Sequence, residues 1–269
     1  MPSFTLRLLL EKIPPRVIPW QFVDLLETDP ARRVKLKIAY EGLAKLHPAD
    51  IADIVEDLPA AERESVFETI DEEVAAETLE ELDPDVKVSI VESLDKDRVA
   101  DIVEEMAPDA AADLLAELPK ETSEELLEEM PGQEAQEVRE LLEYNPSTAG
   151  GMMNTDFVFV GEGATREEVL GWMRDQELNL DQLDTIVLLD KAAQFSGTVP
   201  VARLLLAEPE QPLSDLKMEP LLSLPPDASD HEVFEIFDKY NLRMLTIVDE
   251  NGRPMGTVTV DDVVSKLLK

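Results

Sequence analysis

The sequence predicts an α + α/β multidomain protein, in which a right-handed superhelix of short helices is followed by two similar α/β modules. Three observations lead to this prediction. An apolar pattern recurs every 12 residues through the middle of the chain, the pattern changes near residue 145, and a strand–helix–strand–strand–helix order then occurs twice. At 269 residues the chain is long enough to hold several domains.

Acidic residues dominate the composition. The chain has 60 Asp and Glu against 24 Lys and Arg, a formal net charge of −36. Because such a chain repels phosphates, we expect no nucleic-acid partner. The absence of cysteine excludes thiolate metal sites and cysteine nucleophiles. No apolar run approaches the ~18 residues of a membrane span, and no signal peptide is evident, so we expect a cytoplasmic location.

Most of the negative charge lies in the middle of the chain. Residues 51–140 hold 31 acidic and six basic residues, whereas residues 1–50 hold six acidic and eight basic ones. Charged segments with few aromatic residues are often disordered. The apolar pattern of this segment argues against disorder.

Every twelfth residue from Leu58 to Leu142 is apolar, and so are the residues four and three positions before each of them, with the exceptions of Thr78 and Arg139. These spacings place the apolar side chains on one helical face. We call the apolar residues at every twelfth position the anchors. Pro or Asp follows most of them, which ends one helix and begins the next. Helices this short are unstable alone, but stacked neighbours share a core. We therefore expect a superhelix over residues 48–144.

After a turn cluster at 145–148, two α/β modules are expected, over residues 145–208 and 209–269. The capping box Thr165/Glu168 begins a helix that runs through Met173, and a hairpin turn is expected at 249–252. Strands are expected at 157–160, 185–189, 197–201, 220–224, 244–248 and 256–259, and the second module's helices at 228–240 and 260–268.

The second module ends in a way that is typical of CBS domains, with V-D-E-N-G at 248–252 and G-T-V-T-V-D-D at 256–262. Residues 145–269 therefore resemble a tandem CBS domain pair. The stretches L-H-P-A-D-I-A-D at 46–53 and A-G-G-M-M at 149–153 resemble the N-terminal domain of MgtE-type magnesium transporters. Residues 1–47 resemble the tail of a PRC-barrel-like segment found ahead of these modules in soluble bacterial proteins.

In the MgtE family, Mg²⁺ joins the helical domain to the CBS pair and favours a compact, closed state. The resemblance implies metal ligands at Asp109, Asp113, Glu77 and Asp262. Asp109 and Asp113 are four residues apart, so they share one helical face. Every repeat carries acidic residues, and Asp53 or Asp101 could hold the place assigned to Asp113. The simpler alternative is that these acids form a solvated surface.

Three positions depart from the family pattern, because Asn241, Ser265 and His231 stand where acids are usual. Each change removes negative charge from a site for a hard cation. Mg²⁺ binds oxygen ligands octahedrally and keeps several waters, so two carboxylates can suffice with weak affinity.

CBS pairs also bind adenine nucleotides, through a Thr or Ser and an Asp three residues later that contact the ribose. Thr259 and Asp262 match this pattern in the second module. The first module has P-V-A-R at 200–203 in the equivalent place. The alternative is that Thr259 and Asp262 form only a helix capping box.

The resemblance thus implies a cytosolic Mg²⁺-sensing regulatory region of an MgtE-like transporter, with a transmembrane channel domain after this chain and a homodimer formed through the CBS pair. We expect residues near 145–152 to be a linker that lets the two parts separate when metal is absent. The alternative is a stand-alone adenine-nucleotide-responsive or structural CBS adaptor without metal gating. The sequence contains no Gly-rich phosphate loop, G-x-S-x-G or H-E-x-x-H, so we expect no enzyme.

Overall fold

The computed structural model describes residues 23–28, 34–38, 43, 46–176 and 183–268. They fall into two compact units, Met1–Arg98 and Val99–Lys269. Most of the segment expected to resemble a PRC-barrel tail lies outside the described residues. In the described part of it, strands β1 (Val23–Thr28) and β2 (Val34–Ile38) pair antiparallel.

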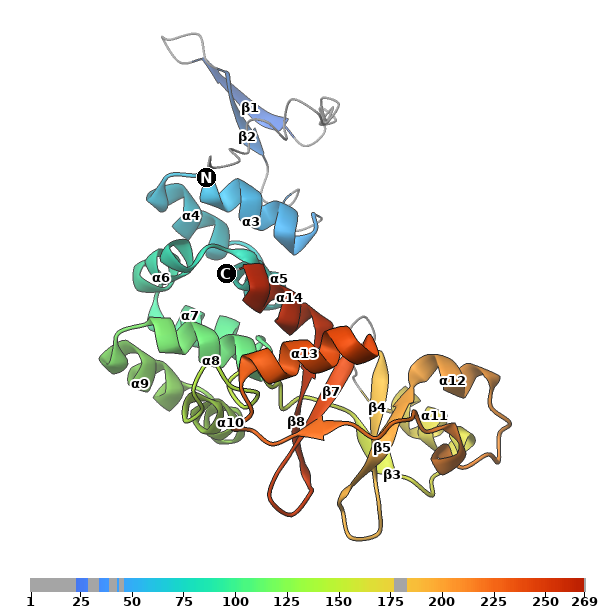
Figure 1. The fold of residues 1–269 in the computed structure, drawn as a ribbon. Coiled ribbons are helices and arrows are strands. Elements are labelled where there is room, and N and C mark those ends of the chain that lie inside the picture. The colour runs from blue at the N-terminus through green and yellow to red at the C-terminus, as the bar shows by residue number, and fades with distance from the viewer. Residues whose placement is uncertain (1–22, 29–33, 39–42, 44–45, 177–182, 269) are drawn as a thin grey trace. The chain divides into compact units, whose positions relative to one another are not determined.

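The described span from 46 to 147 contains eight helices, each of which begins 12 residues after the previous one, as the sequence predicts (Figure 1). They are α3 (Pro48–Glu56), α4 (Ala60–Phe67), α5 (Glu72–Glu81), α6 (Pro84–Ser93), α7 (Lys96–Glu104), α8 (Pro108–Glu117), α9 (Lys120–Glu129) and α10 (Gly132–Leu142). Among the described residues, no helix has the length and apolar character needed to cross a bilayer.

The apolar residue that recurs every 12 positions stands shortly after the end of its helix, except for Leu142, which is the last residue of α10. Leu82, Leu94, Leu118 and Met130 are the C-caps of their helices, where the backbone turns from helical to extended, and their side chains are buried. A proline or an N-cap residue then begins the next helix. The anchors therefore mark where the chain turns and also hold that turn against the core.

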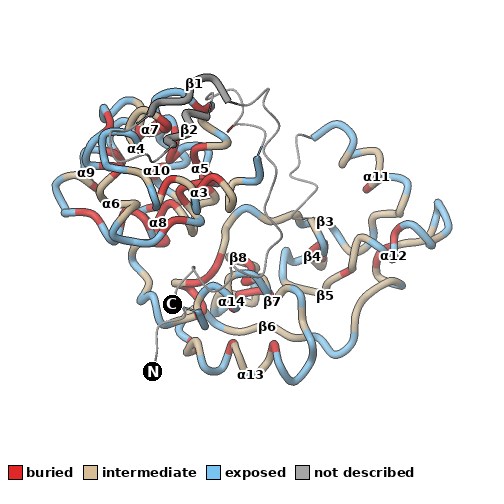
Figure 2. Tube along the Cα trace, turned by 90° about the horizontal axis from the view of Figure 1, so that it is seen from above, coloured by how far each residue is buried: buried red, intermediate tan, exposed pale blue. Residues whose placement is uncertain are grey.

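Most of the packing joins a helix to the second helix along the chain, with smaller contacts between adjacent helices. In the first unit α3 contacts α5 and α4 contacts α6, and in the second unit α8 contacts α9 and α10. Their buried faces hold the predicted apolar stripe (Figure 2). The packing fits a superhelix of short helices. Its right-handed sense stays a prediction.

Basic side chains bind the carbonyl ends of these helices. Arg63 lies at the end of α3, where its Nε donates to Val55 O (3.0 Å) and Leu58 O (2.9 Å) and its Nη2 donates to Glu56 O (2.8 Å). The last carbonyls of a helix lack partners within it and carry the negative end of its dipole. Three further basic side chains donate to backbone carbonyls in the same way: Lys87 to Glu80 O, Arg98 to Phe67 O and Ile70 O, and Arg139 to Leu127 O.

Two small sheets with the same topology follow, as expected. In the order β3-β4-β5 and again in β6-β7-β8, the first pair of strands is parallel and the second antiparallel. The elements are β3 (Phe159–Gly161), α11 (Arg166–Arg174), β4 (Thr185–Leu189), β5 (Phe195–Pro200), α12 (Val201–Leu206), the 3₁₀ helix η2 (Leu213–Leu216), β6 (Ser223–Leu224), α13 (Asp230–Tyr240), β7 (Met244–Val248), β8 (Pro254–Thr259) and α14 (Val260–Leu268).

Five elements of the modules differ in their bounds from the prediction; two of them, β5 and β8, each begin two residues earlier than expected. α13 begins at Asp230 rather than Ala228, because Ser229 and Glu232 form a capping box there. β3 begins two residues later than expected and β6 has only two residues. The predicted capping box of Thr165 and Glu168 is present.

Each module's leading segment hydrogen-bonds to the last strand of the other module. Ahead of β3, Asn154 exchanges backbone hydrogen bonds of 2.8 and 2.9 Å with Thr257 of β8. Ahead of β6, the Met218 N–H donates to Thr198 O of β5 (2.9 Å). The two modules are therefore interlocked, although the sequence suggested two consecutive blocks.

Glycines provide the space for these crossings. A Cβ on Gly256 would lie 2.8 Å from the carbonyl oxygen of Asn154, and one on Gly197 would lie 3.1 Å from Cδ of Lys217. The two glycines occupy matching places in β8 and β5. Side chains there would push the leading segments away.

The segment expected to be a free linker is bound to the second module. Three backbone hydrogen bonds join the two. The Ala149 N–H donates to Ala228 O (2.8 Å) and the Gly150 N–H to Pro226 O (2.8 Å), while the Asp230 N–H of the module donates to Ser147 O of the segment (3.1 Å). A Cβ on Gly151 would lie 2.3 Å from Asn145 O. Residues 145–152 are thus a packed junction in this structure, because the A-G-G sequence lets backbones approach closely.

Thr78 interrupts the apolar repeat at a position that is 0 % exposed, and its hydroxyl has no hydrogen-bond partner within the described part of the chain. We predict that Thr78→Val raises the free energy of unfolding by about 1 kcal/mol, because it removes a buried hydroxyl at nearly constant volume. Urea denaturation would measure this. Thr69→Val is the control, since Thr69 is exposed and its hydroxyl donates to Ser65 O (2.7 Å). A Thr78→Val protein no more stable than the wild type would contradict the prediction.

Candidate functional site

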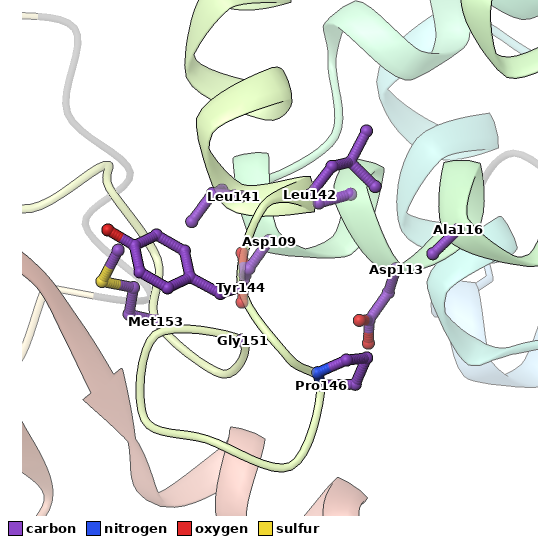
Figure 3. A pocket seen from close by; sticks show the side chains of 10 residues that line it. Asp109, Asp113, Ala116, Leu141, Leu142, Tyr144, Pro146, Gly151 and Met153 are labelled. Carbon is purple, nitrogen blue, oxygen red and sulfur yellow. The ribbon is translucent and has the colours of Figure 1, made fainter. Parts of the chain in front are cut away.

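A cavity of about 200 Å³ lies in the second unit, beside α8, the end of α10 and the segment that leads into the first module (Figure 3). Asp109 in the first turn of α8 and Asp113 one turn later both line it, as their spacing predicts. Asp109 is half-buried and Asp113 is exposed. The other lining residues are mostly apolar: Ala112, Ala116, Leu141, Leu142, Tyr144, Pro146, Gly151 and Met153.

Asp262 lies in the first turn of α14 and is half-buried. Its Oδ2 accepts hydrogen bonds from the backbone N–H (2.6 Å) and the hydroxyl (2.8 Å) of Thr259, the last residue of β8. In return the Asp262 N–H donates to Thr259 Oγ1 at 3.4 Å. Thr259 and Asp262 therefore form a helix capping box at the start of α14.

The surroundings of Asp262 disfavour its negative charge. Burial is the main cause of a pKa above the usual aspartate value, and the like charges of Asp261 and Asp113 raise the pKa further. The hydrogen bonds from Thr259 act in the opposite direction. The carboxylate of Asp113 in the helical region is thus close enough to act on Asp262 in the second module, and both are predicted metal ligands.

The other two predicted ligands make weaker cases. Asp109 shares the cavity with Asp113, and Glu77 lies exposed on α5 in the other unit. In the part of the chain that the structure describes, no three acidic or histidine side chains converge on one point. A cation that needs three protein ligands does not fit here. Mg²⁺ fits better, because it keeps several waters and often binds only one or two carboxylates.

The structure describes all three positions that depart from the family pattern. Asn241 is the C-cap of α13, with φ 49° and ψ 49°. Asn is one of the residues favoured in this left-handed conformation at the end of a helix. His231 is exposed on α13, with Nε2 3.5 Å from Glu235. Ser265 is exposed on α14.

Sequence reasoning missed the apolar wall of the cavity. Tyr144 and Met153 lie on either side of the A-G-G junction, and a Cβ on Gly150 would lie 2.5 Å from the Tyr144 ring. The paired glycines were the available signal, since they indicate a close approach of neighbouring groups.

We predict that Asp262→Asn raises the melting temperature at pH 7 in metal-free buffer. Asparagine can still accept from Thr259, but it carries no charge beside Asp113. The folded-state pKa of Asp262 is raised, so its stabilising contribution is complete below the unfolded value of about 3.9 and is lost as the pH rises through the folded pKa. The advantage of Asp262→Asn should therefore shrink as the pH falls to about 3.9.

Thermal melts between pH 4 and pH 8 would test this, with the exposed neighbour Asp261→Asn as the matched control. An Asp262→Asn protein that melts below the wild type at pH 7 would contradict the sign of the effect. An advantage that is equal at both ends of the range would contradict its origin in titration.

Comparisons with known families support this arrangement. The family described as the MgtE intracellular N domain matches residues 46–147, and the CBS domain family matches residues 213–269. The magnesium transporter MgtE of Thermus thermophilus is 32 % identical over 130 residues, which is 48 % of this chain and 29 % of that protein. MgtE of Bacillus subtilis is 24 % identical over 132 residues, 49 % of this chain and 29 % of that protein. The matches thus span less than a third of these relatives.

Solved structures show the same domain order. The crystal structure of the cytosolic domain of the Mg²⁺ channel MgtE in complex with ATP has a TM-score of 0.77 and 29 % identity, and the match covers 84 % of this chain and 93 % of that one. The soluble part of a magnesium transporter has a TM-score of 0.78 at 22 % identity, with 84 % and 90 % covered, and shows the shared fold. Residues 46–147 thus match the MgtE intracellular N domain family and residues 213–269 match the CBS domain family, and the chain resembles the cytosolic region of MgtE transporters in its fold.

Proposed function

We propose that this chain is a cytosolic, Mg²⁺-sensing regulatory region that acts on the transmembrane channel domain of an MgtE-like transporter. The pairing of Asp113 with Asp262 carries the proposal. The two carboxylates come from the N domain and the second CBS domain, and the negative charge of Asp113 disfavours the charge of Asp262. Both relatives described above are magnesium transporters, and the ATP-bound neighbour is the cytosolic part of such a channel.

A divalent cation would reverse the electrostatics of this pair. Two like charges repel, and partial burial weakens the screening by salt. A cation held by Asp113 and Asp262 would turn that repulsion into attraction and favour the arrangement in which they are near. It shifts the balance only by its difference in affinity between the close and separated arrangements. The ligand roles that the resemblance implies for Asp109 and Glu77 stay predictions, because a site of two carboxylates and several waters does not require them.

Weak affinity suits such a sensor. A site with two carboxylates and several waters would bind Mg²⁺ in the millimolar range, where the binding free energy is about 4 kcal/mol. A site of this strength changes its occupancy over millimolar concentrations of the ion. The region would then respond to the ion by binding it, with no catalytic step.

A homodimer through the CBS pair is part of the proposal. The closing helices of the two modules, α12 and α14, both carry exposed apolar side chains. Leu206 is 90 % exposed and Leu268 is 82 % exposed. Leucines this exposed favour association, and a two-fold axis would let both helices be covered by their counterparts in a second copy.

We predict that Mg²⁺ stabilises the wild-type chain through this pair. With a millimolar site, 10 mM Mg²⁺ should add about 1.4 kcal/mol to the free energy of unfolding, and the melting temperature should rise by a few degrees. The gain should be lost in Asp113→Asn and in Asp262→Asn. Differential scanning fluorimetry with and without Mg²⁺ would measure it, with KCl at matched ionic strength as the salt control.

Asp101→Asn is the matched control variant. Asp101 is exposed and stands at the same place in α7 that Asp113 holds in α8. This variant should keep the full Mg²⁺ response. Small-angle scattering of the same proteins should show compaction by Mg²⁺ only in the wild type and Asp101→Asn. Equal responses in all four proteins would overturn the metal site.

The alternative function is a stand-alone CBS adaptor that responds to adenine nucleotides or serves as a structural adaptor, without metal gating. Thr259 and Asp262 favour the nucleotide form, because they stand together at the end of β8, and the neighbouring cytosolic domain was crystallised with ATP. We predict that AMP or ATP raises the melting temperature of the wild type but not of Thr259→Val, which loses the hydroxyl. A shift with nucleotide and none with Mg²⁺ would favour this alternative over the sensor. No shift with either ligand would leave only the structural adaptor.

A further inference from the structure

The two CBS modules correspond residue by residue at the start of their last helices. In the first module the Val201 N–H donates to Asp184 O, and in the second the Val260 N–H donates to Arg243 O, both at 2.9 Å. In both modules the bond joins the first residue of the last helix to the residue directly before the central strand. By this correspondence Pro200 stands where the second module has Thr259, and Arg203 stands where it has Asp262.

Arg203 makes contacts that its counterpart does not. Its Nη1 donates to the carbonyl oxygens of Leu216 (2.7 Å) and Lys217 (2.8 Å). These two residues belong to the segment that leads into the second module and hydrogen-bonds to β5 through Met218. Asp262, in contrast, bonds to Thr259 of its own module. The same position therefore holds an anion that caps a helix in one module and a cation that binds a crossing segment in the other.

A second polar contact holds the same segment. Lys217 Nζ donates to Glu162 Oε2 (2.6 Å) and to Ser196 Oγ, and the Ser196 hydroxyl donates to Glu162. In the second module the matching positions of Lys217 and Ser196 are Met153 and Met255, which cannot form such a network. Lys217 thus holds the crossing segment against Glu162 and Ser196 of the first module.

We propose that Arg203 locks the first module, so that the CBS pair takes an adenine nucleotide only through the second module. This inference rests on the nucleotide binding proposed above. A ribose needs hydroxyl-accepting groups at these positions, and Pro200 and Arg203 supply none. A ligand would also have to displace two charge-assisted hydrogen bonds between Arg203 and the crossing segment. The two modules share one fold but differ in function.

Isothermal titration of the whole chain with AMP, repeated with ATP, tests the lock by counting sites. We expect one nucleotide per chain in the wild type and a loss of affinity of about tenfold or more in Thr259→Val. Pro200→Thr/Arg203→Asp restores the pair of groups to the first module and should give two nucleotides per chain. Arg203→Lys keeps the cation and should stay at one.

Two sites in the wild type, or one site that survives Thr259→Val unchanged, would overturn the inference while leaving nucleotide binding intact. No binding by the wild type would instead refute the nucleotide function. In that case binding by the double variant would still support the lock, and its absence would overturn the lock as well.

Hydrogen exchange tests the contact without any ligand and without the double variant. In Arg203→Ala the Met218 amide, which donates to Thr198 O, should exchange about tenfold faster or more, because its segment has lost two charge-assisted bonds. The Asn154 amide makes the matching bond to Thr257 in the second module and should not change. Equal exchange at Met218 in the variant and the wild type would overturn the lock.

Discussion

A helix of eight to eleven residues is not stable in water by itself, and the helical region of this chain is built around that constraint. Each helix must bury one face against a neighbour and find partners for the carbonyl groups at its end. The 12-residue repeat supplies the face and places an apolar residue at each turn of the chain. Arg63, Lys87, Arg98 and Arg139 supply the partners for the carbonyl ends.

This use of the basic residues shapes the electrostatics of the surface. Residues 51–140 contain only six bases, and four of them bind helix carbonyls. Of these four, Arg98 also pairs with the carboxylate of Glu72. Most of the 31 acidic residues in the same range therefore face solvent and one another. A cation that lies between two carboxylates would relieve this repulsion. That is the physical role of the ion in the proposed pairing of Asp113 with Asp262.

The sequence predicted local structure well because local structure leaves periodic signals. The eight helices, β4, β7 and α14 lie where the apolar spacing, prolines and turn residues place them. The crossing of the leading segments was missed because the pairing of Asn154 with Thr257 joins residues far apart in the sequence. In the sequence, only Gly197 and Gly256 indicate this crossing, because a side chain at either position would crowd the crossing segment. For the candidate site, the shared face of Asp109 and Asp113 followed from their spacing, whereas the approach of Asp113 to Asp262 depends on tertiary packing.

The cap that Asp262 forms is compatible with the ligand-binding role proposed for the same carboxylate. Both bonds from Thr259 go to the same oxygen, Oδ2, so the cap of α14 does not involve Oδ1. A carboxylate has two oxygens and about four acceptor positions, so capping leaves capacity for a cation or a ribose hydroxyl. In the first module Arg203 has no acceptor at all. In the proposed function, the sign of the charge at this single position therefore separates the half of the pair that would bind a ligand through it from the half that would serve as a scaffold.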